Sequence, residues 1–450
     1  MRQVTSICTI LLAISVFTAC GSSGAAEARG PAPGIGALPA TSPNNTTVAA
    51  ETGNNTSAAS TYAKTANDNA VPGNVSKIPT NKLLYSGSTT KVYAELQGWF
   101  GQPNHMDVGY KSNDPVQVHK QVADAASRGL NGFILDWYGP TVDPVTQQTA
   151  LLLKAEAEAT PGFEFAIMED AGAIRSCANN AGCNVTQALI NDLTYAYNTF
   201  ETSPAYMRHQ GRPVVFFFNV NMLPNINWPQ VRASVPGNPL FVEEYQTGSN
   251  AFAASFLDGG YGWPIINTSN NNDWGQAYLN SFYSAGMASA GKYIVGASYK
   301  GFNDALAAWT MHRVMSQQCG ATYLSTFNQA NSMFNATRQL DAMQIDTWND
   351  YEEGTEIETG IDTCLSVNAG VSGGVLNFAP SGAGNESLTV DHYTVYASTD
   401  GQNLTKLADL PAGSRSLNLA SYGIAPGTIV YVKMQAKPGF LNRMSGAVKF

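Results

Sequence analysis

The segment DTWNDYEEGTEIE, residues 346–358, places six acidic side chains in thirteen positions of a chain with only 13% charged residues. Asp350 and Glu353 are three residues apart, so in a turn or first helical turn their Cβ atoms lie roughly 5–6 Å apart on one side. Two carboxyl groups at this range cannot both ionise freely, so we expect one pKa to rise and the other to fall. Such a pair can hydrolyse a glycosidic bond, with one acid as proton donor and the other as base or nucleophile.

Roles can be assigned within the pair. Glu353 lies further beyond the end of the preceding apolar run than Asp350, so we expect Glu353 to be the general acid and Asp350 the base or nucleophile. The alternative is an acidic helix N-terminus, where carboxylates interact favourably with the helix dipole. We interpret the other acids of the segment as structural or solvated: Glu352, Glu356 and Glu358.

Short apolar runs and helix-like stretches alternate from about residue 90 onward. The runs lie near residues 92, 132, 163, 214, 240, 262, 293 and 343. They are apolar throughout, which is typical of parallel strands buried on both faces. Helices are expected at 114–129, with Asp114 as N-cap, and at 145–159, 186–200, 274–290 and 330–340.

Eight strand–helix units over roughly 270 residues predict an α/β fold of the (β/α)8 TIM-barrel type. A doubly wound open sheet is the competing architecture, but it normally carries a glycine-rich phosphate turn after its first strand. Here the first strand continues into GWFGQPNH, which lacks that pattern.

Polar and aromatic residues follow nearly every expected strand. In a barrel these positions converge on the C-terminal rim, where catalysis takes place. Aromatic rings there suit a sugar, whose C–H faces stack on them. We therefore predict these substrate-binding residues: Trp99, Asp136, Trp137, Tyr138, Glu169, Asp170, Asn219, Glu243, Glu244, Trp263, Tyr299, Trp348 and Asn349.

Other chemistries find little support. His105 and His119 have no paired nucleophile pattern, and the absence of GxSxG argues against acyl transfer. No metal-ligand spacing occurs, and the loop NTSNNNDWG could hold Ca²⁺ but has an ordinary loop composition, so no metal or cofactor is expected. The net charge is −9 without a Lys/Arg stripe, which argues against nucleic acid as a partner.

The stretch WNDYEEGTEIE resembles the signature of glycoside hydrolase family 71, the endo-α-1,3-glucanases, which carry Trp-Asn-Asp-Tyr-Gly-Glu. It is also similar to family 99, the endo-α-mannosidases and mannanases, with Trp-Asn-Glu-Trp-x-Glu-Gly-Thr-Gln-Ile-Glu. The first strand, VYAELQGWF, and the second, GFILDWYG, also resemble these families. The resemblance implies that Asp350 and Glu353 are the catalytic acids. Glu352 stands where family 71 has Gly.

The N-terminus predicts export. A short apolar stretch followed by FTAC is typical of a lipoprotein signal peptide, here residues 1–19, with Cys20 as the lipidated residue. A plain signal with an incidental Cys is the alternative. Residues 20–82 are rich in small and polar residues and predict a disordered tether.

Four further cysteines agree with an oxidising compartment and suggest two disulfides. Three pairings are possible. Local loop closure would join Cys177 to Cys183 and leave Cys319 with Cys364. A zinc site is the alternative, although no CxxC pair or flanking His is present.

The predicted barrel domain covers residues 83–363. Residues 364–450 alternate apolar and polar side chains between turns, which predicts a small antiparallel β-sandwich resembling a fibronectin type III module. We expect a monomeric, membrane-anchored or secreted hydrolase acting on an α-linked polysaccharide, with α-1,3-glucan as the main candidate. The alternatives are an α-mannan hydrolase of family 99 type, a non-catalytic glycan-binding lipoprotein, and a C-terminal module that itself binds cell wall or polysaccharide.

Overall fold

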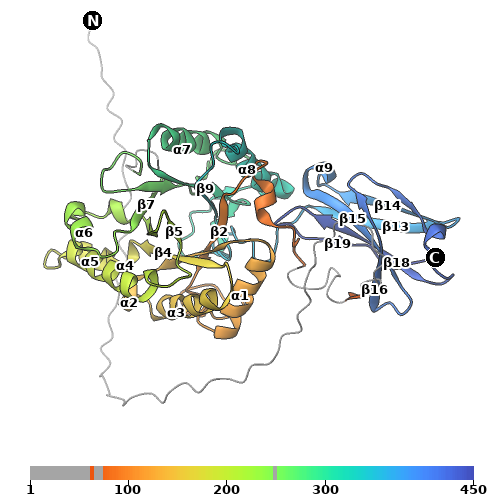
Figure 1. Cartoon of the computed structure of the whole chain (residues 1–450), viewed down its shortest axis with the longest axis horizontal. Helices are drawn as coiled ribbons and strands as arrows, with labels where there is room; N and C mark the ends of the chain where they lie inside the picture. The colour runs from red at the N-terminus through yellow and green to blue at the C-terminus, as the bar shows by residue number, and fades with distance from the viewer. Residues whose placement is uncertain (1–60, 65–73, 247–250) are drawn as a thin grey trace, which may run out of the picture. The chain divides into compact units, whose positions relative to one another are not determined.

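Eight parallel strands close into a barrel surrounded by helices (Figure 1). The computed structural model describes residues 61–64, 74–246 and 251–450. The strands pair in the order β4-β3-β2-β12-β9-β8-β7-β6, and pairing of β4 with β6 closes the ring. Their bounds confirm all eight expected strands: β2 (Lys91–Gln97), β3 (Gly132–Trp137), β4 (Glu164–Asp170), β6 (Arg212–Phe218), β7 (Leu240–Glu244), β8 (Gly259–Tyr261), β9 (Tyr293–Ser298) and β12 (Ala342–Ile345).

The barrel strands are buried on both faces. Every residue of β3, β7, β9 and β12 is buried, which is why these segments read as continuous apolar runs rather than alternating ones. The short strand β5 (Arg208–His209) extends the sheet antiparallel to β6. Strands β10 (Phe302–Asn303) and β11 (Val314–Met315) form a separate antiparallel pair beyond β9.

Most of the expected helices are present. Asp114 caps α1 by accepting a hydrogen bond from Val116 N at 2.9 Å, as its position predicted. The long helices are α1 (Pro115–Ser127), α3 (Pro144–Ala159), α5 (Val185–Ala196), α7 (Gln276–Ala288) and α8 (Ala321–Met333). Three short helices between β3 and β7 were not predicted: α2 (Gly139–Val142), α4 (Gly172–Ala178) and α6 (Trp228–Ser234).

The helix predicted at 330–340 was wrong. Helix α8 ends at Met333, and the chain then turns at Asn335. The Asn335 side chain accepts hydrogen bonds from the N–H groups of Thr337 and Arg338, which favours a turn over another helical turn.

The C-terminal residues form two antiparallel sheets. One contains β13 (Leu365–Ser372), β14 (Val375–Gly382) and β17 (Ser416–Asn418). Apolar side chains of both sheets belong to one hydrophobic cluster, as expected for a sandwich. The short helix α9 (Glu386–Thr389) precedes β15. The other sheet contains β1 (Thr61–Ala63), β15 (Val390–Ser398), β16 (Asn403–Pro411), β18 (Ile429–Ala436), β19 (Arg443–Met444) and β20 (Val448–Lys449).

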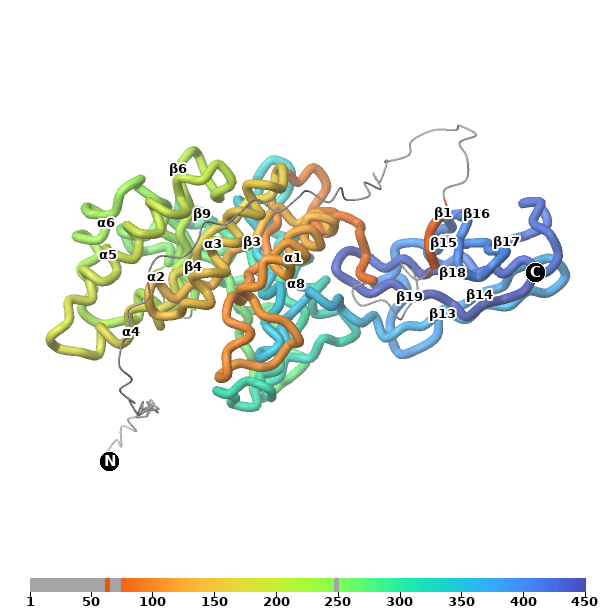
Figure 2. Tube along the Cα trace, turned by 90° about the horizontal axis from the view of Figure 1, so that it is seen from below, coloured from red at the N-terminus to blue at the C-terminus, as the bar shows by residue number. Residues whose placement is uncertain are grey.

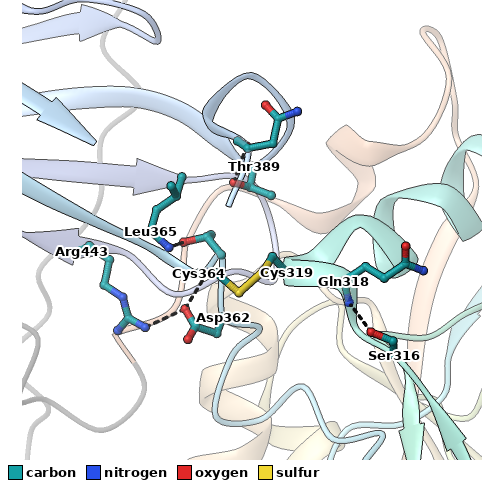
Figure 3. Close-up of a disulfide and its surroundings, with 10 residues drawn as sticks. Ser316, Gln318, Cys319, Asp362, Cys364, Leu365, Thr389 and Arg443 are labelled. Carbon is teal, nitrogen blue, oxygen red and sulfur yellow. Dashed lines mark hydrogen bonds and ion pairs between the residues drawn. A yellow bond between two sulfur atoms is a disulfide. The ribbon is translucent and has the colours of Figure 1, made fainter. Parts of the chain in front are cut away.

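Both suggested disulfides are present. Cys177 bonds to Cys183, and Cys319 bonds to Cys364. The second bond joins the segment before α8 to the segment that enters β13 (Figure 3). Asp362 beside it accepts a hydrogen bond from Arg443 at 2.8 Å.

The described part of the predicted tether makes specific contacts. Strand β1 pairs with β16, as Figure 2 shows, and Val75 pairs with Leu441. Lys77 forms an ion pair with Asp124 of α1. Ordered structure therefore begins upstream of residue 83, because backbone pairing holds a segment with few large apolar side chains. The predicted signal peptide and Cys20 lie outside the described residues, and within them no helix is long and apolar enough to cross a membrane.

Candidate active site

The acidic segment forms a turn directly after β12. Trp348 N donates to Glu95 O at 2.7 Å, which fastens the segment beside β2. Thr355 N donates to Asp350 O at 3.0 Å and closes the turn. Residues 346–358 contain no helix, so the alternative explanation by a helix N-terminus does not apply. Arg128 stabilises the turn, because its Nη1 donates a hydrogen bond to Ile357 O at 2.8 Å.

The turn brings Asp350 and Glu353 together. The N–H groups of Glu352 and Glu353 donate to Asp350 Oδ1 at 3.0 and 2.8 Å. Gln97 Nε2 lies 3.4 Å from Asp350 Oδ2. Asn349 supports this arrangement through two hydrogen bonds with the Gln97 backbone, at 2.8 and 3.1 Å. The carboxylate of Asp350 therefore has a fixed orientation.

Glu353 has a different environment. Its Oε1 accepts a hydrogen bond from Trp309 Nε1 at 3.4 Å and lies 3.7 Å from Arg313 Nη2. Asp304 fixes the loop that carries Trp309 and Arg313, because its carboxylate accepts hydrogen bonds from Arg313 N and Nε, both at 2.8 Å. Glu353 keeps 17% of its side chain exposed, whereas Asp350 is 2% exposed as a residue.

Burial raises the pKa of both acids. The pKa of Asp350 lies well above its usual range because of burial and the neighbouring Glu353 charge, and the backbone N–H donors only partly oppose this. Burial also raises the pKa of Glu353, opposed by the Trp309 hydrogen bond and the Arg313 charge. The expectation that one pKa would fall was therefore wrong, since both groups lose solvent.

Both acids open into one cavity of about 200 Å³. Its wall combines carboxyl groups with aromatic rings, contributed by the carboxyl ends of several strands and the loops that follow them. The lining residues are Glu95, Gln97, Trp99, His105, Asp136, Tyr138, Met168, Asp170, Phe218, Trp263, Trp309, Asp350 and Glu353.

Unpartnered polar atoms mark the cavity as a binding site. Gln97 Oε1 and Asp136 Oδ1 are buried and have no hydrogen-bond partner among the described residues. A buried polar atom without a hydrogen-bond partner destabilises the folded protein, and the hydroxyl groups of a ligand could supply the missing hydrogen bonds. Burial raises the pKa of Asp170 to about 6, and burial with the Asp136 charge raises that of Glu95 well above its usual range.

Seven of the fifteen predicted catalytic and substrate-binding residues line the cavity: Trp99, Asp136, Tyr138, Asp170, Trp263, Asp350 and Glu353. The alternation of side chains along a strand explains several of the others. Trp137 follows Asp136 and turns outward, where its Nε1 donates to Gln147 of α3 at 2.8 Å and its ring stacks on Tyr195 of α5. Glu169 precedes Asp170 and lies near Asp192 of α5.

The remaining predicted contacts also lie outside the cavity wall. Trp348 packs on Phe133 and Arg128, and Tyr299 donates to Trp274 O at 2.9 Å. Asn349 orients Gln97 and so supports the site indirectly. The set is completed by Asn219, directly after β6, and by Glu243 and Glu244 at the end of β7.

Six lining residues were not predicted: Glu95, Gln97, His105, Met168, Phe218 and Trp309. A signal was available for two of them, since Glu95, Gln97 and Trp99 alternate along one face of an otherwise apolar segment. Trp309 lies in a long loop, and nothing in its neighbourhood in the sequence links it to Glu353. Across the described ranges, no group of three or more His, Cys, Asp or Glu residues is arranged to hold a metal ion.

A (β/α)8 barrel with paired carboxyl groups and aromatic side chains at its C-terminal rim is an arrangement typical of glycoside hydrolases. The sequence matches the family described as Glycosyl hydrolase family 71 over residues 105–363, more than half of the chain. The chain therefore belongs to glycosyl hydrolase family 71 and is a glycoside hydrolase.

Two solved structures of a GH99 endo-alpha-mannosidase from Bacteroides thetaiotaomicron are similar at 18% identity. The first covers 60% of this chain and 88% of that chain with a TM-score of 0.48. The second, in complex with BIS-TRIS-Propane, covers 60% and 86% with a TM-score of 0.47. An FMN-binding beta-glucuronidase from Facaelibacterium prausnitzii L2-6 is 8% identical and covers 80% and 56%, with a TM-score of 0.40. No curated protein matches the chain.

Proposed function

We propose that this hydrolase cleaves a neutral α-linked polysaccharide internally, with α-1,3-glucan as the substrate. The observation that carries the proposal is the single cavity that holds Asp350 and Glu353 between aromatic walls. The resemblance of WNDYEEGTEIE to the endo-α-1,3-glucanases of family 71 supports the linkage and the internal cleavage.

The chemistry of the wall favours an uncharged substrate. Five carboxyl groups and no Lys or Arg line the cavity among the described residues, so no fixed positive charge of the wall would pair with an acidic sugar. Buried oxygens such as Asp136 Oδ1 can accept hydrogen bonds from sugar hydroxyls. Trp99, Trp263 and Trp309 offer faces for the C–H surfaces of the ring.

We assign the proton donor to Glu353 and the base or nucleophile to Asp350. Three N–H groups, from Glu352, Glu353 and Gln97, point at Asp350 and stabilise its anion. Burial raises the pKa of both acids, so the pair retains a proton, and Glu353, the more exposed of the two, can pass it to the glycosidic oxygen, which leaves as a hydroxyl group. Asp350 then activates a water molecule or attacks the anomeric carbon itself.

Digestion of a glycan panel with product analysis tests this proposal. The wild type should release oligosaccharides from α-1,3-glucan, and Asp350→Asn and Glu353→Gln should each lower the rate by roughly 10²–10⁴-fold. Glu356→Gln is a matched control, because Glu356 lies in the same turn but pairs with Lys300 at 2.6 Å outside the cavity wall. Cleavage of α-mannan but not of α-1,3-glucan would indicate an α-mannan hydrolase of family 99 type. Tight glycan binding without turnover at any pH would indicate a non-catalytic glycan-binding protein.

We also propose export of the chain as a lipoprotein attached through Cys20 that acts as a monomer. The two disulfides support an oxidising compartment. Cys20→Ser should move the protein from the membrane fraction to the soluble fraction, and unchanged membrane retention would contradict the anchor. Sedimentation of the released protein should give one chain per particle.

A further inference from the structure

Glu352 is a buried acid of the catalytic turn that does not itself line the cavity. It is 1% exposed, and its carboxylate meets three polar groups of the segment that follows β2. Trp99 Nε1 and His105 Nδ1 each lie 3.0 Å from Oε2, and Met106 N lies 2.9 Å from Oε1. Three contacts on one buried carboxylate make Glu352 a clamp between the turn and the segment 99–106.

The clamp determines which nitrogen of His105 is engaged. Trp99 Nε1–H and Met106 N–H can only donate, so Glu352 accepts from both. With both of these groups donating to it, Glu352 takes the Nδ1–H of His105 as its third donor, which leaves Nε2 for other partners. Within the described residues no hydrogen bond to Nε2 is present, and the His105 side chain keeps 13% of its surface exposed and lines the cavity.

His105 and Glu353 have a common neighbour in Trp309. Its ring stacks on Trp99 with centroids 4.9 Å apart and planes 17° apart. Trp309 contacts the His105 ring edge-on at 6.2 Å, and Trp309 Nε1 donates to Glu353 Oε1. Both His105 and Trp309 line the cavity. The histidine is therefore linked to the predicted proton donor through one shared aromatic neighbour.

We propose that His105 Nε2 binds a hydroxyl of the sugar on the leaving-group side, and that Glu352 is the positioning residue that orients His105. The proposal rests on the proposed function, since it places the leaving group beside Glu353. It also accounts for Glu352 where the family 71 signature has Gly, a residue without a carboxylate for this clamp. His105 is then a specificity-determining residue, and Glu352 acts only through the segment 99–106.

A double-mutant cycle on an oligosaccharide substrate tests the proposal. His105→Ala should raise KM about tenfold with kcat within about twofold, because the lost contact is made equally in the ground and transition states. Glu352→Gln should raise KM about three- to tenfold. The double variant should raise KM by clearly less than the product of the two single effects, because the part of the Glu352 effect that passes through His105 is already lost in His105→Ala. Glu356→Gln should leave KM within about twofold of the wild type.

Three results would overturn the proposal: an unchanged KM in His105→Ala, effects that multiply in the double variant, or a loss of kcat without a change in KM. Thermal unfolding of each variant identifies loss of folding, and His105→Gln replaces His105→Ala if the latter unfolds. A wild type without turnover on any glycan would defeat the proposed function instead. In that case, calorimetry on the same variants measures the oligosaccharide Kd and tests whether His105 binds the sugar. An unchanged Kd in His105→Ala would reject the proposed role of His105.

Discussion

Glu201 provides a quantitative test of how the barrel buries its acids. It lies at the end of the π-helical turn Tyr197–Glu201 that follows α5, and it is fully buried. Neither side-chain oxygen has a hydrogen-bond partner among the described residues. Burial raises its pKa from 4.5 to about 8, only partly opposed by the charge of Arg208.

The sign follows from the direction of this change. The folded state holds the Glu201 proton more tightly than the unfolded state, so its contribution to stability is fully present below about pH 4.5 and is lost as the pH rises towards 8. Each unit of pKa difference corresponds to about 1.4 kcal/mol. Integrated between pH 5 and pH 8, this one residue lowers the free energy of unfolding by about 3–4 kcal/mol.

Glu201→Gln removes the titrating group and nearly keeps the shape of the side chain. Between pH 5 and pH 8, the free energy of unfolding of this variant should therefore fall by about 3–4 kcal/mol less than that of the wild type. Urea unfolding at pH 5 and pH 8 measures the difference, with tryptophan fluorescence as the signal, since all seven tryptophans lie within residues 83–363. Glu158→Gln is the matched control. Glu158 is exposed and bonded to Ser203, and this hydrogen bond lowers its pKa, so it stays ionised across the same range. Parallel pH curves for Glu201→Gln and the wild type would refute the reasoning.

Two further predictions concern the parts that hold the site. Replacing Cys319 and Cys364 by Ser should lower the free energy of unfolding by about 4 kcal/mol, because this bond closes a loop with a sequence separation of 45. The same change at the other disulfide, with a separation of 6, should cost about 2 kcal/mol, and urea unfolding of both variants under non-reducing conditions compares them. Asp304→Ala should lower the free energy of unfolding by about 1–3 kcal/mol and raise KM, because Arg313 and the loop carrying Trp309 lose their anchor. An unchanged KM in Asp304→Ala would show that the loop carrying Trp309 does not contribute to substrate binding.

The fold could be predicted because its signals are local. Eight apolar runs at barrel spacing and the capped helix after Asp114 depend on neighbours in the chain, and all of them are present. The helix placed at 330–340 failed because the hydrogen bonds of the Asn335 side chain favour a turn. Strand β1 could not be predicted, since it pairs with β16 and its Tyr62 ring contacts Tyr396 of β15, both more than 300 residues away in the sequence.

The site was predictable at its centre and less so at its wall. The spacing of Asp350 and Glu353 predicted that the two acids lie together, and both line one cavity. Asp136 and Asp170, predicted from strand ends, line the same cavity. The prediction included neighbouring residues at several strand ends, although the alternation of side chains turns Trp137 outward and places Glu169 near Asp192 of α5. His105 and Trp309 come from loops. His105 is held by Glu352, 247 residues away in the sequence, and Trp309, whose loop Asp304 fixes locally, contacts Glu353, 44 residues further along the chain.

Glycosyl fluorides offer the most direct test of the central claim, that Asp350 and Glu353 share the cavity with separate roles. Fluoride leaves without a proton donor, so an α-configured oligosaccharide fluoride of the cleaved linkage bypasses the general acid. Glu353→Gln should hydrolyse the fluoride at a rate within about tenfold of the wild type and remain inactive on the polysaccharide, while Asp350→Asn should fail on both. Loss of the fluoride reaction in Glu353→Gln, or polysaccharide cleavage by either variant at the wild-type rate, would contradict the assignment.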